Sequence, residues 1–138
     1  MGFFTDEERI KKLDLLRLIY LLAFLLSFGI TEFGRKIYRP YIYSQNINDF
    51  GLADSIGNLG GILVQIFFGM TLFNPSRKQG LRLILLFIVG YIVYEILQPI
   101  LPRGVFDWMD IYGTLLGGGF GTLIFLGLHW LRNRLPAK

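Results

Sequence analysis

Residues 13–33 read LDLLRLIYLLAFLLSFGITEF, a long and almost unbroken apolar stretch. A helix needs about 20 such residues to cross the hydrocarbon core of a bilayer. Glu32, Gly34 and Arg35 stand where a signal peptide would have small residues and a cleavage site. The stretch therefore predicts a transmembrane helix that stays in the protein.

Three further apolar stretches follow, over about residues 52–73, 81–101 and 106–130. The third contains Pro99, which predicts that its regular helix stops at Gln98. The sequence thus predicts an all-α polytopic membrane protein with four transmembrane helices, forming a single domain over residues 1–138.

The composition excludes several classes of function. Hydrophobic residues make up 53% of the chain and charged residues 17%, against about a quarter charged in soluble domains. The chain has no Cys, so disulfides and thiolate zinc sites are excluded, and its single His excludes multi-His metal sites. The net charge of +4 sits at the ends of apolar segments. We therefore expect no nucleic-acid partner, no cofactor and no metal site built from His or Cys, while Mg²⁺ held by carboxylates stays open.

Lys and Arg are unevenly divided between the two sides of the predicted membrane. One side has ten of them: Arg9, Lys11, Lys12, Arg17, Arg77, Lys78, Arg82, Arg132, Arg134 and Lys138. The other side has four: Arg35, Lys36, Arg39 and Arg103. Positive residues favour the cytoplasmic side, so we expect both termini in the cytoplasm.

The two predicted hairpins, over about residues 13–73 and 81–130, resemble each other. Residues 54–61 (DSIGNLGG) and 110–117 (DIYGTLLG) share four identities in eight positions. A duplication of two-span units predicts a pseudo-two-fold axis along the membrane normal. Chance similarity between Gly-rich and Leu-rich helices is the alternative.

Glycines and polar residues recur along spans two and four. Helical spacing puts Asp54, Asn58 and Gln65 on one face, and Asp110 and Thr114 on another. The glycines form series that favour close packing of spans two and four: Gly57, Gly61, Gly113, Gly117 and Gly121. Capping of the helix starts is the simpler role for both aspartates.

Glu95 lies about a turn from the end of span three, a costly depth for a carboxylate. Gln98 shares its face, and Arg103 in the short loop is the natural partner for Glu95 or Asp110. The first hairpin offers Glu32 with Arg35 or Arg39. These groups predict either a ligand-binding site on the outer side or a set of structural salt bridges.

The order Glu95-x-x-Gln98, Pro102-Arg103, Asp110-x-x-x-Thr114-x-x-Gly117 resembles the signature of the VanZ-like family of small bacterial membrane proteins. Thr114 stands where that family has Asn, whereas the first hairpin keeps the Asn form at Asn58. The resemblance covers residues 81–124 well and the first hairpin loosely. It implies a multi-pass protein of the bacterial inner membrane, linked to resistance to teicoplanin, a lipid-bearing glycopeptide.

Three functions are consistent with this sequence. The first is a non-enzymatic envelope protein that binds membrane lipid, with a lipid-linked cell-wall component or a lipoglycopeptide headgroup as its ligand. Arginines would hold a phosphate or carboxylate, and the acids would accept from hydroxyls or amines. The second is an accessory subunit of a larger membrane complex, or a homo-oligomer. The third is an enzyme acting on a lipid headgroup; no catalytic residue is assigned, because His129 is expected at the opposite interface.

Overall fold

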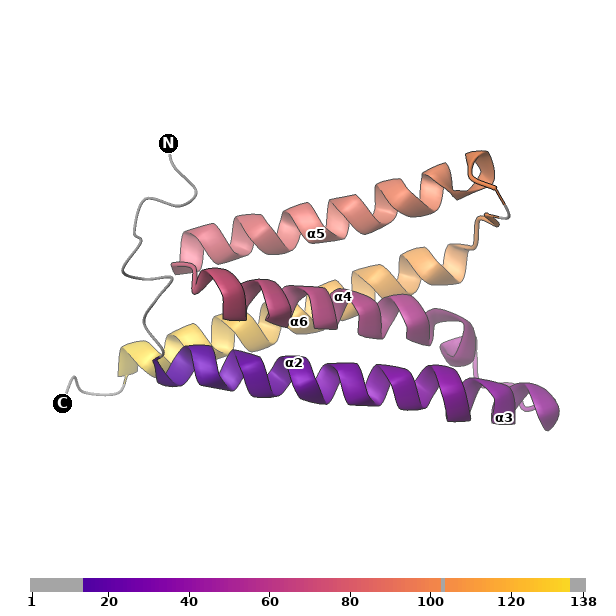
Figure 1. Cartoon of the computed structure of the whole chain (residues 1–138), viewed down its shortest axis with the longest axis horizontal. Coiled ribbons are helices and arrows are strands. Elements are labelled where there is room, and N and C mark those ends of the chain that lie inside the picture. The colour runs from indigo at the N-terminus through magenta and orange to yellow at the C-terminus, as the bar shows by residue number, and fades with distance from the viewer. Residues whose placement is uncertain (1–13, 103, 135–138) are drawn as a thin grey trace.

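The computed structural model describes residues 14–102 and 104–134, and every regular element in these ranges is a helix. The four long helices are α2 (Leu15–Phe33), α4 (Leu52–Phe73), α5 (Arg77–Leu97) and α6 (Trp108–Arg134). Consecutive long helices run in opposite directions along the bundle (Figure 1). The first turn of α2 and the last turn of α6 lie at one end, and α3 (Arg39–Ser44) lies at the other, which we call the α3 end.

All four long helices are long and apolar enough to span a membrane. Large apolar side chains cover their outer surfaces, as lipid contact requires. Span two has the predicted bounds, and span three changes at Gln98 into the short 3₁₀ helix η2 (Gln98–Ile100), which contains Pro99. These features indicate a multi-pass membrane protein.

The first span continues beyond the predicted end of its helix at Phe33. The chain passes through η1 (Gly34–Tyr38), a π-helical segment, directly into α3. Pro40 has no N–H and its ring displaces the carbonyl four residues before it, and a wider turn accommodates that strain. Arg35, Lys36 and Arg39, predicted in a loop, therefore lie on a helix.

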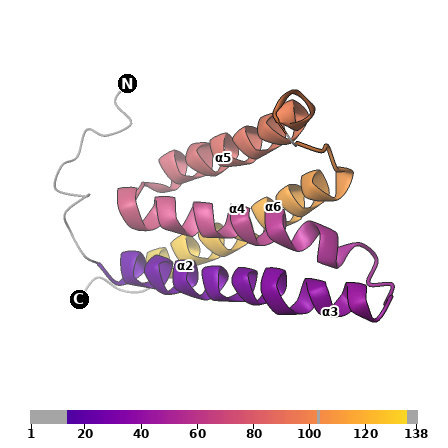
Figure 2. The same ribbon diagram turned by 45° about the vertical axis from the view of Figure 1, so that its right-hand side comes forward.

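α4 is the central helix of the bundle, packed against both α6 and α2, while α5 packs mainly against α6 (Figure 2). A Cβ on Gly117 would lie 2.3 Å from the carbonyl oxygen of Leu59, and one on Gly113 would lie 2.5 Å from that of Ser55. A Cβ on Gly121 would also meet a side chain of α4, at 2.7 Å. These glycines let the backbones of α4 and α6 touch.

The α4 glycines differ from the predicted pattern. Nothing lies within 4 Å of a Cβ added to Gly57, so this residue makes no close helix contact among the described residues. Gly61 faces the hydroxyl of Tyr91 on α5, 3.2 Å from its added Cβ. The close contact with α2 is made by Gly60, whose Cβ would lie 2.0 Å from Oγ1 of Thr31. Glycine spacing alone does not identify which neighbour each glycine meets.

The apolar core occupies the half of the bundle away from the α3 end. Tyr20 is fully buried there, with its ring centroid 6.5 Å from that of Phe67 and 6.2 Å from that of Phe125. His129, predicted at the interface, is only 2% exposed and its ring packs on Phe125. The polar side chains that the sequence singles out lie toward the α3 end, away from this core.

Candidate functional site

A buried carboxylate is the centre of the candidate site. Glu95 lies in the last turn of α5 and is 2% exposed. Its Oε1 accepts a hydrogen bond from Nδ2 of Asn58 on α4 at 2.9 Å. Its Oε2 accepts from Nε2 of Gln98, one turn further along the chain, at 2.6 Å. The structure thus brings together three residues that the sequence had placed on two different hairpins.

Burial of a carboxylate is unfavourable unless its oxygens are hydrogen-bonded. Asn58 and Gln98 each satisfy one oxygen of Glu95, but both are neutral amides. A carboxylate oxygen has more than one lone pair, so Glu95 keeps acceptor capacity for a further donor. A hydroxyl or ammonium group is the kind of donor that would use it.

Asp54 on α4 is the centre of a second polar group. Its Oδ1 accepts a hydrogen bond from the hydroxyl of Tyr43 on α3 and lies 3.7 Å from Nη2 of Arg39. Nε of Arg39 in turn donates to the Tyr43 oxygen at 3.1 Å. The helical continuation into α3 brings both partners to Asp54.

Asp110 on α6 links these two groups electrostatically. It is half-buried and lies close enough to Glu95, Asp54 and Arg39 to interact with their charges. Thr114, one turn deeper, is fully buried, and its hydroxyl donates to the backbone carbonyl of Asp110 at 2.9 Å. Asp110 therefore keeps part of its surface exposed at the α3 end, whereas Thr114 is buried and bonded within its own helix.

Other residues cap α4 and α6. Asp49 accepts from the backbone N–H groups of Gly51 and Ala53, at 3.1 and 2.6 Å. Asp107 accepts from the N–H of Met109 at 2.9 Å. Capping was the simpler role proposed for Asp54 and Asp110, and in the described structure it falls to Asp49 and Asp107.

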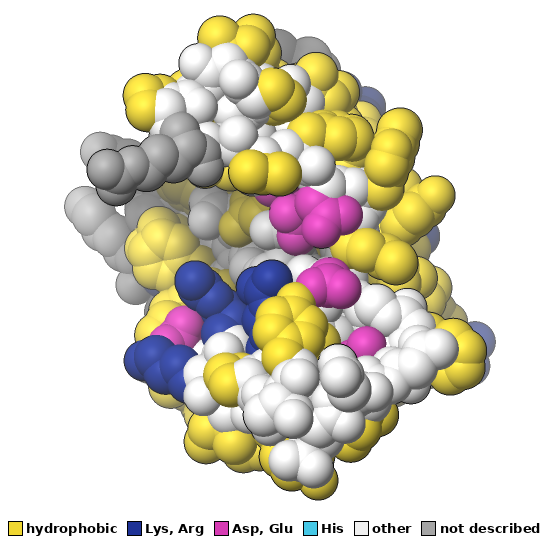
Figure 3. All heavy atoms as spheres, turned by 90° about the vertical axis from the view of Figure 1, so that its right-hand side faces the viewer, with side chains coloured by type: hydrophobic (Ala, Val, Ile, Leu, Met, Phe, Trp, Pro, Cys, Tyr) yellow, Lys and Arg dark blue, Asp and Glu magenta, His cyan; other side chains and the backbone are white. Residues whose placement is uncertain are grey.

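The remaining predicted residues lie apart from this arrangement or outside the described structure. Glu32 pairs along its own helical segment, with Lys36 at 2.8 Å and Arg35 at 3.7 Å. Arg103 lies outside the described residues, so its predicted pairing with Glu95 or Asp110 stays a prediction. Figure 3 views the α3 end and shows acidic and basic side chains gathered near the middle of this face.

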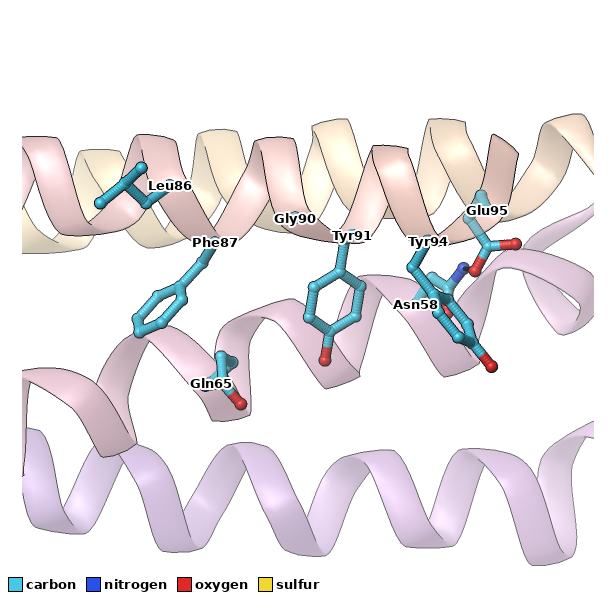
Figure 4. A pocket seen from close by; sticks show the side chains of 8 residues that line it. All are labelled: Asn58, Gln65, Leu86, Phe87, Gly90, Tyr91, Tyr94 and Glu95. Atoms are coloured by element: carbon cyan, nitrogen blue, oxygen red, sulfur yellow. Dashed lines mark hydrogen bonds between the residues drawn. The ribbon is translucent and has the colours of Figure 1, made fainter. Parts of the chain in front are cut away.

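A pocket of about 440 Å³ lies between α4 and α5 and reaches Glu95 (Figure 4). Its lining residues are Asn58, Gln65, Leu86, Phe87, Gly90, Tyr91, Tyr94 and Glu95. Tyr91 and Tyr94 were not among the predicted site residues. A signal was present, because Phe87 and Tyr91 precede Glu95 by eight and four residues and so share its helix face.

The described residues contain no group of three or more His, Cys, Asp or Glu side chains placed to hold a metal ion. At the α3 end the described carboxylates, amides, phenols and Arg39 form hydrogen bonds and charge pairs. Comparisons with protein-family models, with curated proteins and with solved structures find no match to this chain.

Proposed function

We propose that this protein is a non-enzymatic integral membrane protein that binds the headgroup of an amphipathic lipid at the α3 end. The main support for this proposal is the buried carboxylate of Glu95, which Asn58 and Gln98 hold at the polar end of the pocket between α4 and α5. An amphipathic ligand fits such a pocket, with its head near Glu95 and its chains in the surrounding bilayer. Arg39, Asp54 and Asp110 supply further polar contacts around the head.

Binding fits the side chains better than catalysis. Both oxygens of Glu95 are occupied by amide donors, which suits a fixed acceptor more than a residue that exchanges protons. His129, the single histidine of the chain, packs on Phe125 near the other end of α6. A headgroup reaching Glu95 therefore stays far from the one imidazole base.

The ligand class and the cellular setting follow from the resemblance to the VanZ-like family. We propose a bacterial cytoplasmic membrane protein with both termini in the cytoplasm, so that the α3 end faces the outer leaflet. A lipid-linked cell-wall component or a lipoglycopeptide such as teicoplanin would reach the site from there. The ten-to-four division of Lys and Arg supports this orientation.

We also propose that the two hairpins are a duplicated unit. Asp54 and Asp110 both lie in the first turn of their helices at the α3 end, and Gly61 and Gly117 follow each at the same spacing. The units have diverged, since Asn58 bonds to Glu95 whereas Thr114 bonds to its own helix. The ligand site lies across the two units.

The experiment compares Glu95→Gln with Glu32→Gln, the same change at a carboxylate paired only along its own helical segment in the described structure. Each variant is purified in mild detergent, and retained lipids are identified by native mass spectrometry. Teicoplanin susceptibility of a sensitive strain expressing each variant gives a second measurement. We expect Glu95→Gln to lose both the lipid and any protection, and Glu32→Gln to keep them. Equal behaviour of the two variants would contradict the proposal.

A further inference from the structure

The pocket between α4 and α5 carries hydrogen-bonding groups well below Glu95. Gln65 lies seven residues after Asn58 on α4, which places it about 10 Å further along the helix axis. The hydroxyl of Tyr91 lies between these levels, beside Gly61. In Figure 4 the rings of Phe87, Tyr91 and Tyr94 project from α5 toward α4. The polar part of the pocket is therefore elongated along the bundle.

The deeper polar groups lack protein partners. Neither the Gln65 amide nor the Tyr91 hydroxyl makes a hydrogen bond to any side chain or backbone group within residues 14–102 and 104–134. Both line the pocket and are half-buried at membrane depth. An unpaired amide or hydroxyl is unfavourable in hydrocarbon, so an occupant that hydrogen-bonds here is favoured over a plain acyl chain.

The charge of the pocket selects among polar occupants. Among residues 14–102 and 104–134, its lining includes the carboxylate of Glu95 and no Lys or Arg. An anionic phosphate would meet repulsion there. A single ammonium group would satisfy Glu95 and leave without a partner both Gln65, about 10 Å further along the helix axis, and Tyr91, which lies between them. An uncharged group with several hydroxyls along its length satisfies all three.

From this arrangement we infer that the pocket binds the hydroxyl-rich, uncharged headgroup of a glycolipid, lying lengthwise along α4 and α5 from Glu95 to Gln65. This inference rests on the proposed headgroup binding and adds Gln65 and Tyr91 as binding residues. The carboxylate and amides bond the hydroxyls, which act as both donors and acceptors. The rings of Phe87, Tyr91 and Tyr94 provide flat apolar walls against which a sugar ring packs.

The test uses the full chain in phosphatidylcholine nanodiscs. Each preparation contains one type of probe lipid at varied content. The probes are digalactosyldiacylglycerol, which is uncharged and hydroxyl-rich, phosphatidylglycerol, which is anionic, and phosphatidylethanolamine, which carries an ammonium group. Melting temperature is measured against probe content for the unchanged chain and for Gln65→Leu and Tyr91→Phe. Tyr112→Phe is the matched control, because Tyr112 is 54% exposed on α6 and does not line the pocket.

We expect digalactosyldiacylglycerol to raise the melting temperature most. Gln65→Leu and Tyr91→Phe should each weaken its apparent affinity roughly five- to tenfold, the factor for one lost neutral hydrogen bond. Tyr112→Phe should leave the affinity unchanged. If the glycolipid stabilises all variants equally, this pocket is not its site and the inference is wrong. If an ionic probe stabilises more, and neither Gln65→Leu nor Tyr91→Phe weakens that stabilisation, headgroup binding survives and the glycolipid assignment fails. If no probe stabilises the protein, both proposals fail.

Discussion

Nδ2 of Asn58 donates a hydrogen bond to Oε1 of Glu95, and this 2.9 Å bond joins the first hairpin to the second. α4 and α5 otherwise meet through contacts such as Gly69 against Phe87, where an added Cβ would lie 2.8 Å from the ring. The bond therefore both partners the buried carboxylate and fixes the two helices that form the walls of the pocket.

The first prediction concerns this bond. Asn58→Leu should lower the free energy of unfolding by about 1.5–3 kcal/mol, because it leaves a buried charged group with one partner fewer. The double variant Asn58→Leu/Glu95→Leu should recover part of that loss, since the charge is then gone. Reversible unfolding in mixed micelles, measured for both single variants and the double variant, gives the coupling energy. Strictly additive effects would mean that the two side chains do not interact.

A second prediction concerns the contact between α4 and α6. Gly117→Ala should destabilise the protein by about 1–3 kcal/mol, because the new methyl group would meet the carbonyl of Leu59 and force the backbones apart. Gly119→Ala is the matched control, since nothing lies within 4 Å of its added Cβ. The control should be neutral or slightly stabilising because alanine favours helix. Melting temperatures in detergent test the pair, and equal shifts would contradict the packing described.

The third prediction concerns orientation. The chain has no Cys, so single cysteines can be introduced without background labelling. Ser44, exposed at the end of α3, should be labelled by a membrane-impermeant reagent in intact cells. Lys78, exposed in the first turn of α5, should be labelled only after the cells are opened. The reverse labelling pattern would overturn the proposed orientation.

A fourth prediction separates binding from stability at Arg39. The ion pair of Arg39 with Asp54 is well exposed, with side-chain exposures of 44% and 39%, so its loss should change stability little. Arg39→Gln should nevertheless weaken lipid retention, because Arg39 is the one described cation that pairs with the polar groups around the site. Arg35→Gln, at a residue paired with Glu32, is the control. Unchanged lipid retention in Arg39→Gln would remove this residue from the site.

Hydrophobicity and proline placement were enough to predict the four spans and the end of the regular helix near Gln98. The local sequence around Pro40 did not predict continued helix, because Gly34, three basic residues and a proline are typical of a loop. Only the packing of η1 and α3 against α4 favours helix there. The residues around Pro40 alone do not show that this segment will pack against α4.

Only some residues of the candidate site could be predicted from the sequence, for a similar reason. Glu95, Asn58 and Gln98 stand out because polar side chains are rare at membrane depth. Tyr91 and Tyr94 do not, because aromatic residues are common in membrane helices and only the pocket distinguishes them. The capping role, weighed as the alternative for Asp54 and Asp110, falls to Asp49, shortly before α4, and to Asp107, directly before α6. The exact helix start decides which aspartate reaches the free N–H groups.

The π-helical segment η1 determines which side chains of α3 face Asp54. The π turn takes up one residue more than an α turn, so Arg39 and Tyr43 face about 100° away from where a continuous α-helix of the same sequence would put them. If Gly34–Tyr38 closed as α-helix without a change of length, Arg39 and Tyr43 would turn away from Asp54, whereas deletion of one residue together with that closure would keep them facing it. The helix type and the residue count between Phe33 and Pro40 therefore act together in setting which side chains reach the site.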